Sequence, residues 1–448
     1  MNIALIILAA GKGTRMQSEL PKVLHKVAGA PMLIHAMRAG RALEPKRTII
    51  VAGHGFEAVS ATARAEDPEV EIVRQETQLG TGHAVDQARA ALDDFDGTVI
   101  VLYGDCPLIQ PRTLEELTAT LSTAAVSVLG FEAENPARYG RLITDGDRLK
   151  RIVEFKDATP AERAVRLCNS GVMAASAELL FDLLSEIDAN NASGELYLTD
   201  VIGKAVGRGL SCTAIRCAER ETLGVNSRVE LMQAEKEFQT LRRAEALEDG
   251  ISMPAPETVH FSYDTVIGRD AIIEQNVVFG PGVTVESGAQ IRAFSHLEGA
   301  HVARGCVVGP YARLRPGAEL AEDVKIGNFV EIKASTLDEG AKVNHLSYIG
   351  DAHIGARANI GAGTITCNYD GVMKHRTSIG EAAFIGSNTM LVAPITVGQD
   401  AMTASGSVIT RDVPAGDLAI ARSKQDNKAG FSVKLMNKLR ALKAAKQN

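Results

Sequence analysis

The chain has 448 residues, 45% of them hydrophobic and 23% charged, and a formal net charge of −7. This composition excludes a disordered or collagen-like chain, and the lack of a basic excess argues against a protein that coats nucleic acid. Six cysteines without a C-x-x-C pair fit free thiols in a reducing cytoplasm, and glycine is frequent, at 41 residues, whereas aromatic residues make up only 4%.

The chain opens with the apolar segment 1–8, which lacks the basic start of a signal peptide and is expected to be a buried strand. No apolar run approaches the roughly 20 residues of a membrane-spanning helix, so we expect a soluble, cytoplasmic protein without a membrane partner. Up to residue 228, β-branched runs (48–51, 98–103) alternate with helical stretches (85–92, 114–121). This alternation predicts an α/β domain, residues 1–228, with a mostly parallel, Rossmann-like sheet and a ligand beyond the carboxyl ends of its strands.

The glycine-rich segment Leu8–Met16 follows the first strand and matches neither the G-x-G-x-x-G nor the Walker spacing, so a plain tight turn is one interpretation. The other is a phosphate site, because glycines let backbone N–H groups approach phosphate oxygens while Arg15 and Lys22 supply cations. Asp105 follows the run 98–103. It is either a loop cap or a Mg²⁺ ligand that faces nucleotide phosphates.

Segment 229–249 is predicted to be one amphipathic helix, since apolar residues recur at every third or fourth position and Gly250 ends it. We expect this helix to link the first domain to a second domain, residues 250–448. Asn226 has the chemistry of an N-cap for the helix.

Beyond this helix, apolar residues recur at every sixth position, as in Ile267, Ile273 and Phe279. Neither a helix nor an alternating strand has this period, whereas a hexapeptide-repeat parallel β-helix places one inward side chain on each short face. Glycine often follows the inward residue, as at Gly327 and Gly380. Tight corners with positive φ are the expected reason.

Two segments depart from the repeat. The polar segment 366–378 is too long for a corner and is predicted to project as a loop, where function is often found. The basic tail 428–448 carries spaced apolar residues and is predicted to be a helix that packs on its own or a neighbouring subunit. Binding to a membrane surface is the alternative.

His345 and Tyr348 stand out within the repeat. Arg315 and Lys333 precede them and are 18 residues apart, the length of three six-residue faces. This spacing allows all four side chains to line neighbouring faces of one groove. A stacked, purely structural histidine is the alternative interpretation.

Four motifs in the first domain resemble those of the sugar-nucleotide pyrophosphorylases: Leu8–Met16, Leu20–Lys22, Gln78–Gly82 and Tyr103–Asp105. Together with the hexapeptide-repeat domain, they make residues 1–430 closely resemble the bacterial bifunctional N-acetylglucosamine-1-phosphate uridylyltransferase/glucosamine-1-phosphate acetyltransferase family. The resemblance implies acetyl transfer from acetyl-CoA to glucosamine 1-phosphate in a C-terminal, left-handed parallel β-helix. Uridylyl transfer from UTP would follow in the N-terminal domain, giving UDP-N-acetylglucosamine for cell-wall and lipopolysaccharide synthesis. Mg²⁺ as cofactor and a homotrimer with sites between subunits are also implied.

The same resemblance assigns residues in the first domain. Lys22 and Arg15 would contact the phosphates, and Asp105 with Asn226 would bind Mg²⁺. The nucleotide and its N-acetyl sugar would be held by Leu8, Ala9, Ala10, Gly11, Gln75, Gly80, Thr81, Tyr103, Gly104, Gly140, Glu154 and Asn169.

In the second domain, the resemblance makes His345 the general base that deprotonates the 2-ammonium of glucosamine, for which the ordinary histidine pKa of about 6.5 is suited. Glucosamine 1-phosphate would be bound by Arg315, Lys333, Tyr348, Asn359 and Lys374. Acetyl-CoA would contact Ala362, Asn368, Tyr369, Ser387, Arg422 and Ser405, the last at a position where many relatives have alanine.

A second hypothesis keeps only the pyrophosphorylase and treats the β-helix as an oligomerisation scaffold. The pair His345 and Tyr348 and the loop that carries Asn368 and Tyr369 discriminate between the two, because a scaffold needs none of them.

Overall fold

The computed structural model of the protein describes residues 2–446, so the last two residues of the predicted tail lie outside it. The chain divides into two units: Met1–Ala246 with Phe261–Asp264, and Leu247–His260 with Thr265–Asn448. Each unit has its own core and its own sheets.

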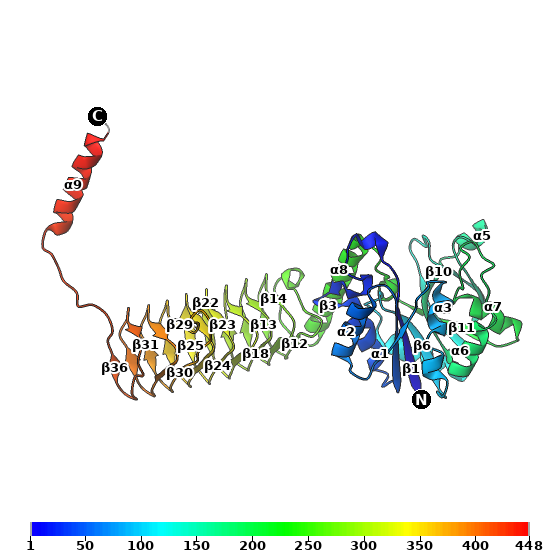
Figure 1. Cartoon of the computed structure of the whole chain (residues 1–448), viewed down its shortest axis with the longest axis horizontal. Helices are drawn as coiled ribbons and strands as arrows, with labels where there is room; N and C mark the ends of the chain where they lie inside the picture. The colour runs from blue at the N-terminus through cyan, green and yellow to red at the C-terminus, as the bar shows by residue number, and fades with distance from the viewer. Residues whose placement is uncertain (1, 447–448) are drawn as a thin grey trace. The chain divides into compact units, whose positions relative to one another are not determined.

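A nine-stranded sheet in the order β5-β4-β1-β6-β10-β7-β11-β9-β8 forms the centre of the first unit (Figure 1). Its strands are β1 (Ile3–Ala9), β4 (Arg47–Ala52), β5 (Glu71–Arg74), β6 (Thr98–Tyr103), β7 (Val126–Glu132), β8 (Arg141–Asp145), β9 (Arg148–Val153), β10 (Leu167–Ser176) and β11 (Cys212–Cys217). Strands β5, β4, β1 and β6 are parallel, as expected. The other half is mixed, because β10 pairs antiparallel with both β6 and β7.

Strand β1 is apolar at every position, so both faces of the sheet present apolar side chains, and helices cover both faces. Ile3, Leu5 and Ile7 face a core shared with α1 (Met32–Arg41), α2 (Phe56–Glu66) and α4 (Pro111–Ala119). Ala4 and Ile6 face the opposite core with α3 (Thr81–Asp86), α6 (Ala177–Leu184) and α7 (Asp200–Gly207), and Figure 1 shows the two helix layers on either side. The short helix α5 (Pro160–Arg163) begins with a capping box.

Helix α8 (Arg228–Glu248) is the expected long helix, and most of it belongs to the first unit. Ala234 on this helix packs in a cluster with Met16 of the glycine-rich segment. The prediction that Asn226 is the N-cap is wrong, since the Ser227 hydroxyl accepts the Glu230 N–H at 3.3 Å. The side chain of Asn226 is thereby left for another role.

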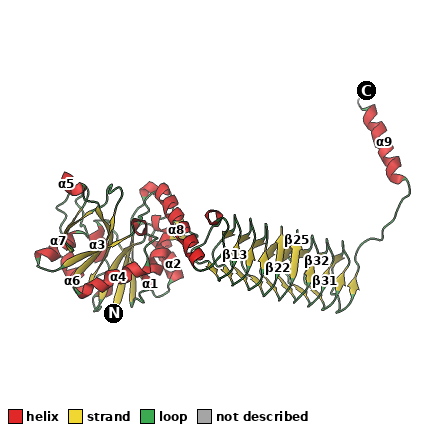
Figure 2. Ribbon diagram, turned by 180° about the vertical axis from the view of Figure 1, so that it is seen from behind, coloured by secondary structure: helices red, strands yellow, loops and turns green. Residues whose placement is uncertain are grey.

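The second unit is a parallel β-helix with three flat faces, as the six-residue period predicts (Figure 2). Face one contains β12 (Val266–Ile267), β15 (Thr284–Val285), β18 (Ala300–Val302), β21 (Ala318–Leu320), β24 (Ser335–Leu337), β27 (Ala352–Ile354), β30 (Thr377–Ile379) and β33 (Ile395–Val397). Face two contains β13 (Ile272–Ile273), β16 (Gln290–Ile291), β19 (Val307–Val308), β22 (Lys325–Asn328), β25 (Lys342–His345), β28 (Asn359–Ile360), β31 (Phe384–Ile385), β34 (Met402–Thr403) and β36 (Leu418–Ala419). Face three contains β14 (Val278–Phe279), β17 (His296–Leu297), β20 (Arg313–Leu314), β23 (Glu331–Lys333), β26 (Tyr348–Gly350), β29 (Ile365–Cys367), β32 (Met390–Val392) and β35 (Val408–Ile409).

The reason predicted for the glycines of the repeat holds for Gly309, which has φ +96°, but is wrong for Gly327 and Gly380, which have no positive φ. The left-handed corner positions are shared between glycines and other residues, among them Tyr311 and Phe329. Gly327 and Gly380 instead lie against the next coil, so that a Cβ on Gly327 would come within 1.9 Å of the Asn344 carbonyl oxygen. Close stacking of coils, and not corner geometry, therefore requires glycine there.

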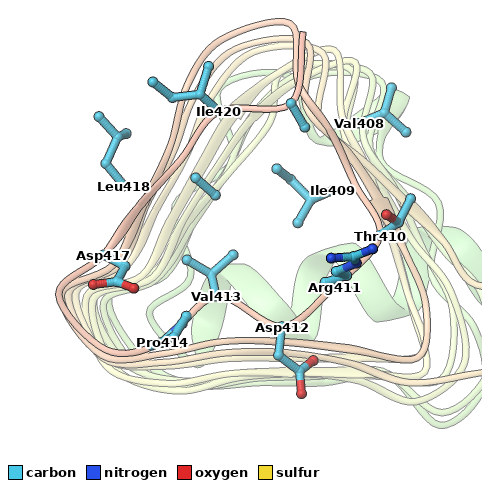
Figure 3. A pocket seen from close by; sticks show the side chains of 12 residues that line it. Val408, Ile409, Thr410, Arg411, Asp412, Val413, Pro414, Asp417, Leu418 and Ile420 are labelled. Carbon is cyan, nitrogen blue, oxygen red and sulfur yellow. The ribbon is translucent and has the colours of Figure 1, made fainter.

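The C-terminal end of the β-helix is open. Its last coil surrounds a hollow of about 420 Å³ into which Ile409 and Val413 point (Figure 3). Helix α9 (Phe431–Ala445) follows as the predicted tail helix, and none of its residues is buried. Within residues 2–446, no helix combines the length and the hydrophobicity that crossing a membrane requires.

Candidate functional site

In the first unit, a cavity of about 360 Å³ lies at the carboxyl ends of β1 and β6. This is the edge at which parallel α/β sheets bind their ligands. Eleven of the residues predicted for this site line the cavity: Leu8, Ala9, Ala10, Gly11, Lys22, Gln75, Gly80, Thr81, Tyr103, Asp105 and Asn226.

Lys22 forms the charged centre of this cavity. Its ammonium makes an ion pair with Asp105 and donates a hydrogen bond to the Asn226 side-chain oxygen at 3.0 Å. The side chains of Lys22 and Asp105 are only 13% and 14% exposed. Two oxygens from distant parts of the chain thus converge on one cationic group. A carboxylate and an amide oxygen are ligands that suit Mg²⁺, so the donor set fits the predicted metal.

The wall around Gly80 is held by a segment far along the chain. Gly80 has φ +117°, and a Cβ there would come within 2.5 Å of the Leu196 carbonyl oxygen, so only glycine fits. The Leu196 N–H bonds the Leu79 carbonyl at 2.8 Å, and the Leu198 N–H bonds the Thr81 hydroxyl at 3.0 Å. This pairing brings Glu195 into the cavity wall. Sequence reasoning missed Glu195, because no local motif marks it.

The residues predicted for the sugar form a neighbouring group. The Asn169 N–H donates to the Gly140 carbonyl at 2.9 Å, and a Cβ on Gly140 would lie 3.3 Å from the Glu154 carboxylate. Burial raises the pKa of Glu154, while a hydrogen bond from the Thr199 hydroxyl at 3.2 Å partly opposes this effect. Burial and the charge of Glu154 also raise the pKa of Tyr103, which connects this group to the cavity.

Two of the predicted residues have other positions. Gly104 is buried and donates its N–H to the Leu8 carbonyl at 3.0 Å, so it holds the turn and does not line the cavity. Arg15, in the 3₁₀ turn Thr14–Met16, has an exposed side chain outside the cavity lining.

In the second unit, the registers of face two align five residues at one position of successive coils: Asn328, His345, Ala362, Ser387 and Ser405. The imidazole Nδ1 of His345 bonds the Asn328 side-chain oxygen at 2.9 Å. Beyond His345 the row contains only small side chains. At its end, the Arg422 guanidinium donates to the Ser405 carbonyl at 2.9 Å.

Cationic side chains gather at the end of face three, where Arg315 follows β20 and Lys333 ends β23. The Glu331 carboxylate bonds Arg315 at 2.8 Å, and Asp351 bonds Lys333 at 3.3 Å. Lys374 comes from the loop between β29 and β30, which interrupts the repeat as predicted. The ammonium of Lys333 lowers the pKa of Lys374, because two like charges approach each other. The group therefore suits a doubly charged phosphate.

Two further predicted residues, Asn368 and Tyr369, lie near these cations. Buried Asn368 donates to Asp351 and to the Tyr348 hydroxyl, the latter at 3.4 Å. Tyr369 is exposed at the start of the projecting loop, where it pairs with Lys374. Asn359 lies on face two, in register with Lys342.

Asn328, Glu331 and Asp351 were not predicted, although each holds a predicted residue. The signal for Asn328 was present, since it precedes His345 by 17 residues, about one coil. Glu331 and Asp351 become visible only from the contacts of the folded chain.

Comparisons with known proteins agree with this division of the chain. Residues 5–171 match the family model of the MobA-like NTP transferase domain, and residues 376–411 match that of the hexapeptide repeat of succinyl-transferase. The protein called bifunctional protein GlmU from Ruegeria pomeroyi is 66% identical, and that from Ruegeria sp. (strain TM1040) is 65% identical. Each alignment covers 100% of this chain and 99% of the relative. A solved UDP-glucose pyrophosphorylase complexed with UDP-glucose aligns at 18% identity and a TM-score of 0.45, over 54% of this chain and 100% of its own.

Proposed function

The chain belongs to the GlmU family of bifunctional enzymes, the family expected from its motifs, and we propose that its two sites divide the two reactions between the two units. The β-helix site transfers an acetyl group from acetyl-CoA to glucosamine 1-phosphate. The cavity of the first unit then transfers uridylyl from UTP to N-acetylglucosamine 1-phosphate and releases pyrophosphate. Relatives that match over their full length are named bifunctional, which favours two activities over a pyrophosphorylase with a passive scaffold.

The uridylyl site acts through positioning and charge. The phosphate oxygen of the sugar phosphate attacks the α-phosphorus of UTP in line, and a general base is unnecessary because the attacking phosphate is already an anion. Lys22 contacts the phosphates, and exposed Arg15 meets them from the glycine-rich turn. Asp105 and Asn226 would hold Mg²⁺, which would supply charge neutralisation. Gly140, Glu154 and Asn169 bind the N-acetyl sugar.

The acetyl site pairs a base with a cationic pocket. His345 takes a proton from the 2-ammonium of glucosamine 1-phosphate, and the resulting amine attacks the thioester carbonyl so that CoA leaves as the thiol. Arg315, Lys333 and Lys374 bind the phosphate, while Tyr348 and Asn359 position the sugar. Acetyl-CoA follows the small residues Ala362, Ser387 and Ser405 toward Arg422, in contact with Asn368 and Tyr369 on the way.

Two observations carry the second activity: the single row that places His345 directly before three small side chains on face two, and the group of three cations at the end of face three. A passive scaffold needs neither. The test measures the half-reactions separately: CoA release from acetyl-CoA with glucosamine 1-phosphate, and pyrophosphate release from UTP with N-acetylglucosamine 1-phosphate and Mg²⁺. Both are expected, and CoA release that does not depend on the amino sugar phosphate would contradict the proposal.

We also propose a homotrimer whose acetyl sites lie between subunits. An exposed ladder of Phe294, Tyr311 and Phe329 supports it: ring centroids are 4.9 and 5.3 Å apart, and the three side chains are 48%, 48% and 54% exposed. All three residues have φ between 56° and 60°, which is unfavourable for bulky side chains. Leu346, next to His345, continues the ladder with φ 50°. A strained, exposed aromatic row beside the base suits a contact between copies.

The double variant Tyr311→Asp/Phe329→Asp is expected to sediment as a monomer and to lose acetyl transfer at least tenfold, because charges replace the apolar contact. Uridylyl transfer should remain within about twofold. Ala382→Asp adds a charge at another exposed corner with φ 55° and should leave the trimer intact. A double variant that stays trimeric by analytical ultracentrifugation would exclude the ladder as the interface.

Glu154→Gln is expected to separate binding from stability. Since burial raises the pKa of Glu154, its ionisation is unfavourable in the folded protein. The free energy of unfolding of the wild type therefore falls as the pH rises above about 4.3, the pKa of a glutamate in the unfolded chain. The variant has no carboxyl group at this position and does not show this fall. At pH 8 the variant should be the more stable protein in urea, while its KM for N-acetylglucosamine 1-phosphate rises about tenfold through the lost charged hydrogen bond. Exposed Glu115→Gln is the control; a lower stability of Glu154→Gln would contradict the argument.

All six cysteines are free thiols. We propose that the enzyme works in the cytoplasm, because free thiols suit a reducing compartment.

A further inference from the structure

Asn328 contacts the ring of His345 from the preceding coil. The two residues end strands β22 and β25 and are direct partners in the parallel register of face two. The Asn328 side-chain oxygen lies 2.9 Å from Nδ1 of the imidazole. Among the described residues, this is the one hydrogen bond that the structure gives to the His345 ring. Asn328 is half-buried, whereas His345 is exposed.

This contact determines where the imidazole carries its proton. A neutral imidazole has one N–H and one bare nitrogen, and either nitrogen can hold the proton. An amide oxygen can only accept a hydrogen bond, so Nδ1 of His345 must be the donor. Nε2 then carries the lone pair and is the nitrogen that can take a proton from a substrate.

Other histidines of the β-helix are held in a different way. His301, His353 and His375 bond a carboxylate through Nε2, at 3.0, 2.8 and 2.7 Å, to Glu286, Asp338 and Asp370 respectively. In each of these three histidines the carboxylate therefore occupies Nε2, which is not open to a substrate. His345 instead has an uncharged acceptor on Nδ1, which keeps Nε2 open.

We propose that Asn328 is a positioning residue for acetyl transfer, which fixes the Nδ1–H tautomer of His345 and aims Nε2 at the amino group of the acceptor. The inference rests on the proposed role of His345 as the base. Asn328 thus becomes a second residue on which acetyl transfer depends, and replacing it is expected to disturb the tautomer of His345.

The test measures both the tautomer of His345 and the rate of acetyl transfer. Asn328→Leu removes the acceptor at similar size, Asn328→Asp retains an oxygen acceptor, and Lys325→Met alters an exposed residue of the same strand as the control. The tautomer of His345 is determined from imidazole ¹⁵N NMR shifts of the full-length protein at pH 9, well above the ordinary histidine pKa of about 6.5. Rates of acetyl transfer are measured at the same pH, and uridylyl transfer reports on folding.

Asn328→Leu is expected to lose the uniform Nδ1–H signature and to lower kcat for acetyl transfer roughly tenfold or more, with KM for acetyl-CoA unchanged. Asn328→Asp should keep the signature and restore most of the rate, and Lys325→Met should resemble the wild type. Retention of the Nδ1–H form or of kcat in Asn328→Leu would overturn the inference. If His345→Ala itself retains acetyl transfer, the assignment of the base fails, and the NMR result distinguishes that failure from an error about Asn328.

Discussion

His345→Ala is expected to lower acetyl transfer by a factor of about 10² to 10⁴, the usual contribution of a positioned general base. The glucosamine nitrogen is protonated near neutral pH and cannot attack the thioester until a base removes its proton. In the proposed mechanism the bare Nε2 of His345 is that base, because Nδ1 is engaged by Asn328. Release of CoA from acetyl-CoA and glucosamine 1-phosphate measures the loss.

Two comparisons make this result specific. Uridylyl transfer by His345→Ala should remain within about twofold of the wild type, because the residues proposed for uridylyl transfer lie in the other unit. His353→Ala removes a half-buried histidine of face one that is paired with Asp338, so acetyl transfer should change little. Undiminished CoA release by His345→Ala would remove His345 from the mechanism.

Asp105→Ala is expected to produce the converse defect, a loss of uridylyl transfer of about 10² or more with acetyl transfer unaffected. Asp105 balances the largely buried ammonium of Lys22 and, with Asn226, would offer oxygen ligands to the proposed Mg²⁺. Without the carboxylate, Lys22 loses its counter-charge and the proposed metal loses its one charged ligand from the protein. Both changes misplace groups that neutralise the transferring phosphate.

Pyrophosphate release from UTP and N-acetylglucosamine 1-phosphate measures the effect of Asp105→Ala. Asp147→Ala, in the exposed turn between β8 and β9, is the matched control and should behave as the wild type. If Asp105→Ala keeps its rate of pyrophosphate release, the charged centre around Lys22 is not the site of uridylyl transfer.

Much of the fold was accessible from the sequence because it follows from periodicity. One inward residue in every six positions is enough to specify three faces, whichever residues form the corners. The direction of strands was less accessible, since the sequence of β10 has the same pattern whether the strand pairs parallel or antiparallel. Glycines such as Gly327 were found but explained wrongly, because the distance between coils, here between Gly327 and Asn344, is a property of the stack.

Some residues of the candidate sites were likewise predictable from local sequence, whereas others were not. Leu8–Gly11 and Tyr103–Asp105 include the carboxyl ends of β1 and β6, so the local motif already places them at one edge of the sheet. Glu195 reaches the cavity through the pairing of Leu196 with Leu79, a contact between distant segments without a local signal. Asp351 likewise acquires its role only when Lys333 and Asn368 meet it.

One chain is proposed to perform both transfers, and a single coupled reaction tests this. The purified full-length protein is given glucosamine 1-phosphate, acetyl-CoA with a ¹³C-labelled acetyl group, UTP and Mg²⁺, and the sugar nucleotides are analysed by mass spectrometry. The expected product is UDP-N-acetylglucosamine that carries the labelled acetyl group, formed together with CoA and pyrophosphate. If no labelled UDP-sugar forms, while UTP and added N-acetylglucosamine 1-phosphate still give the unlabelled product, the β-helix is a scaffold and the claim of two activities is contradicted.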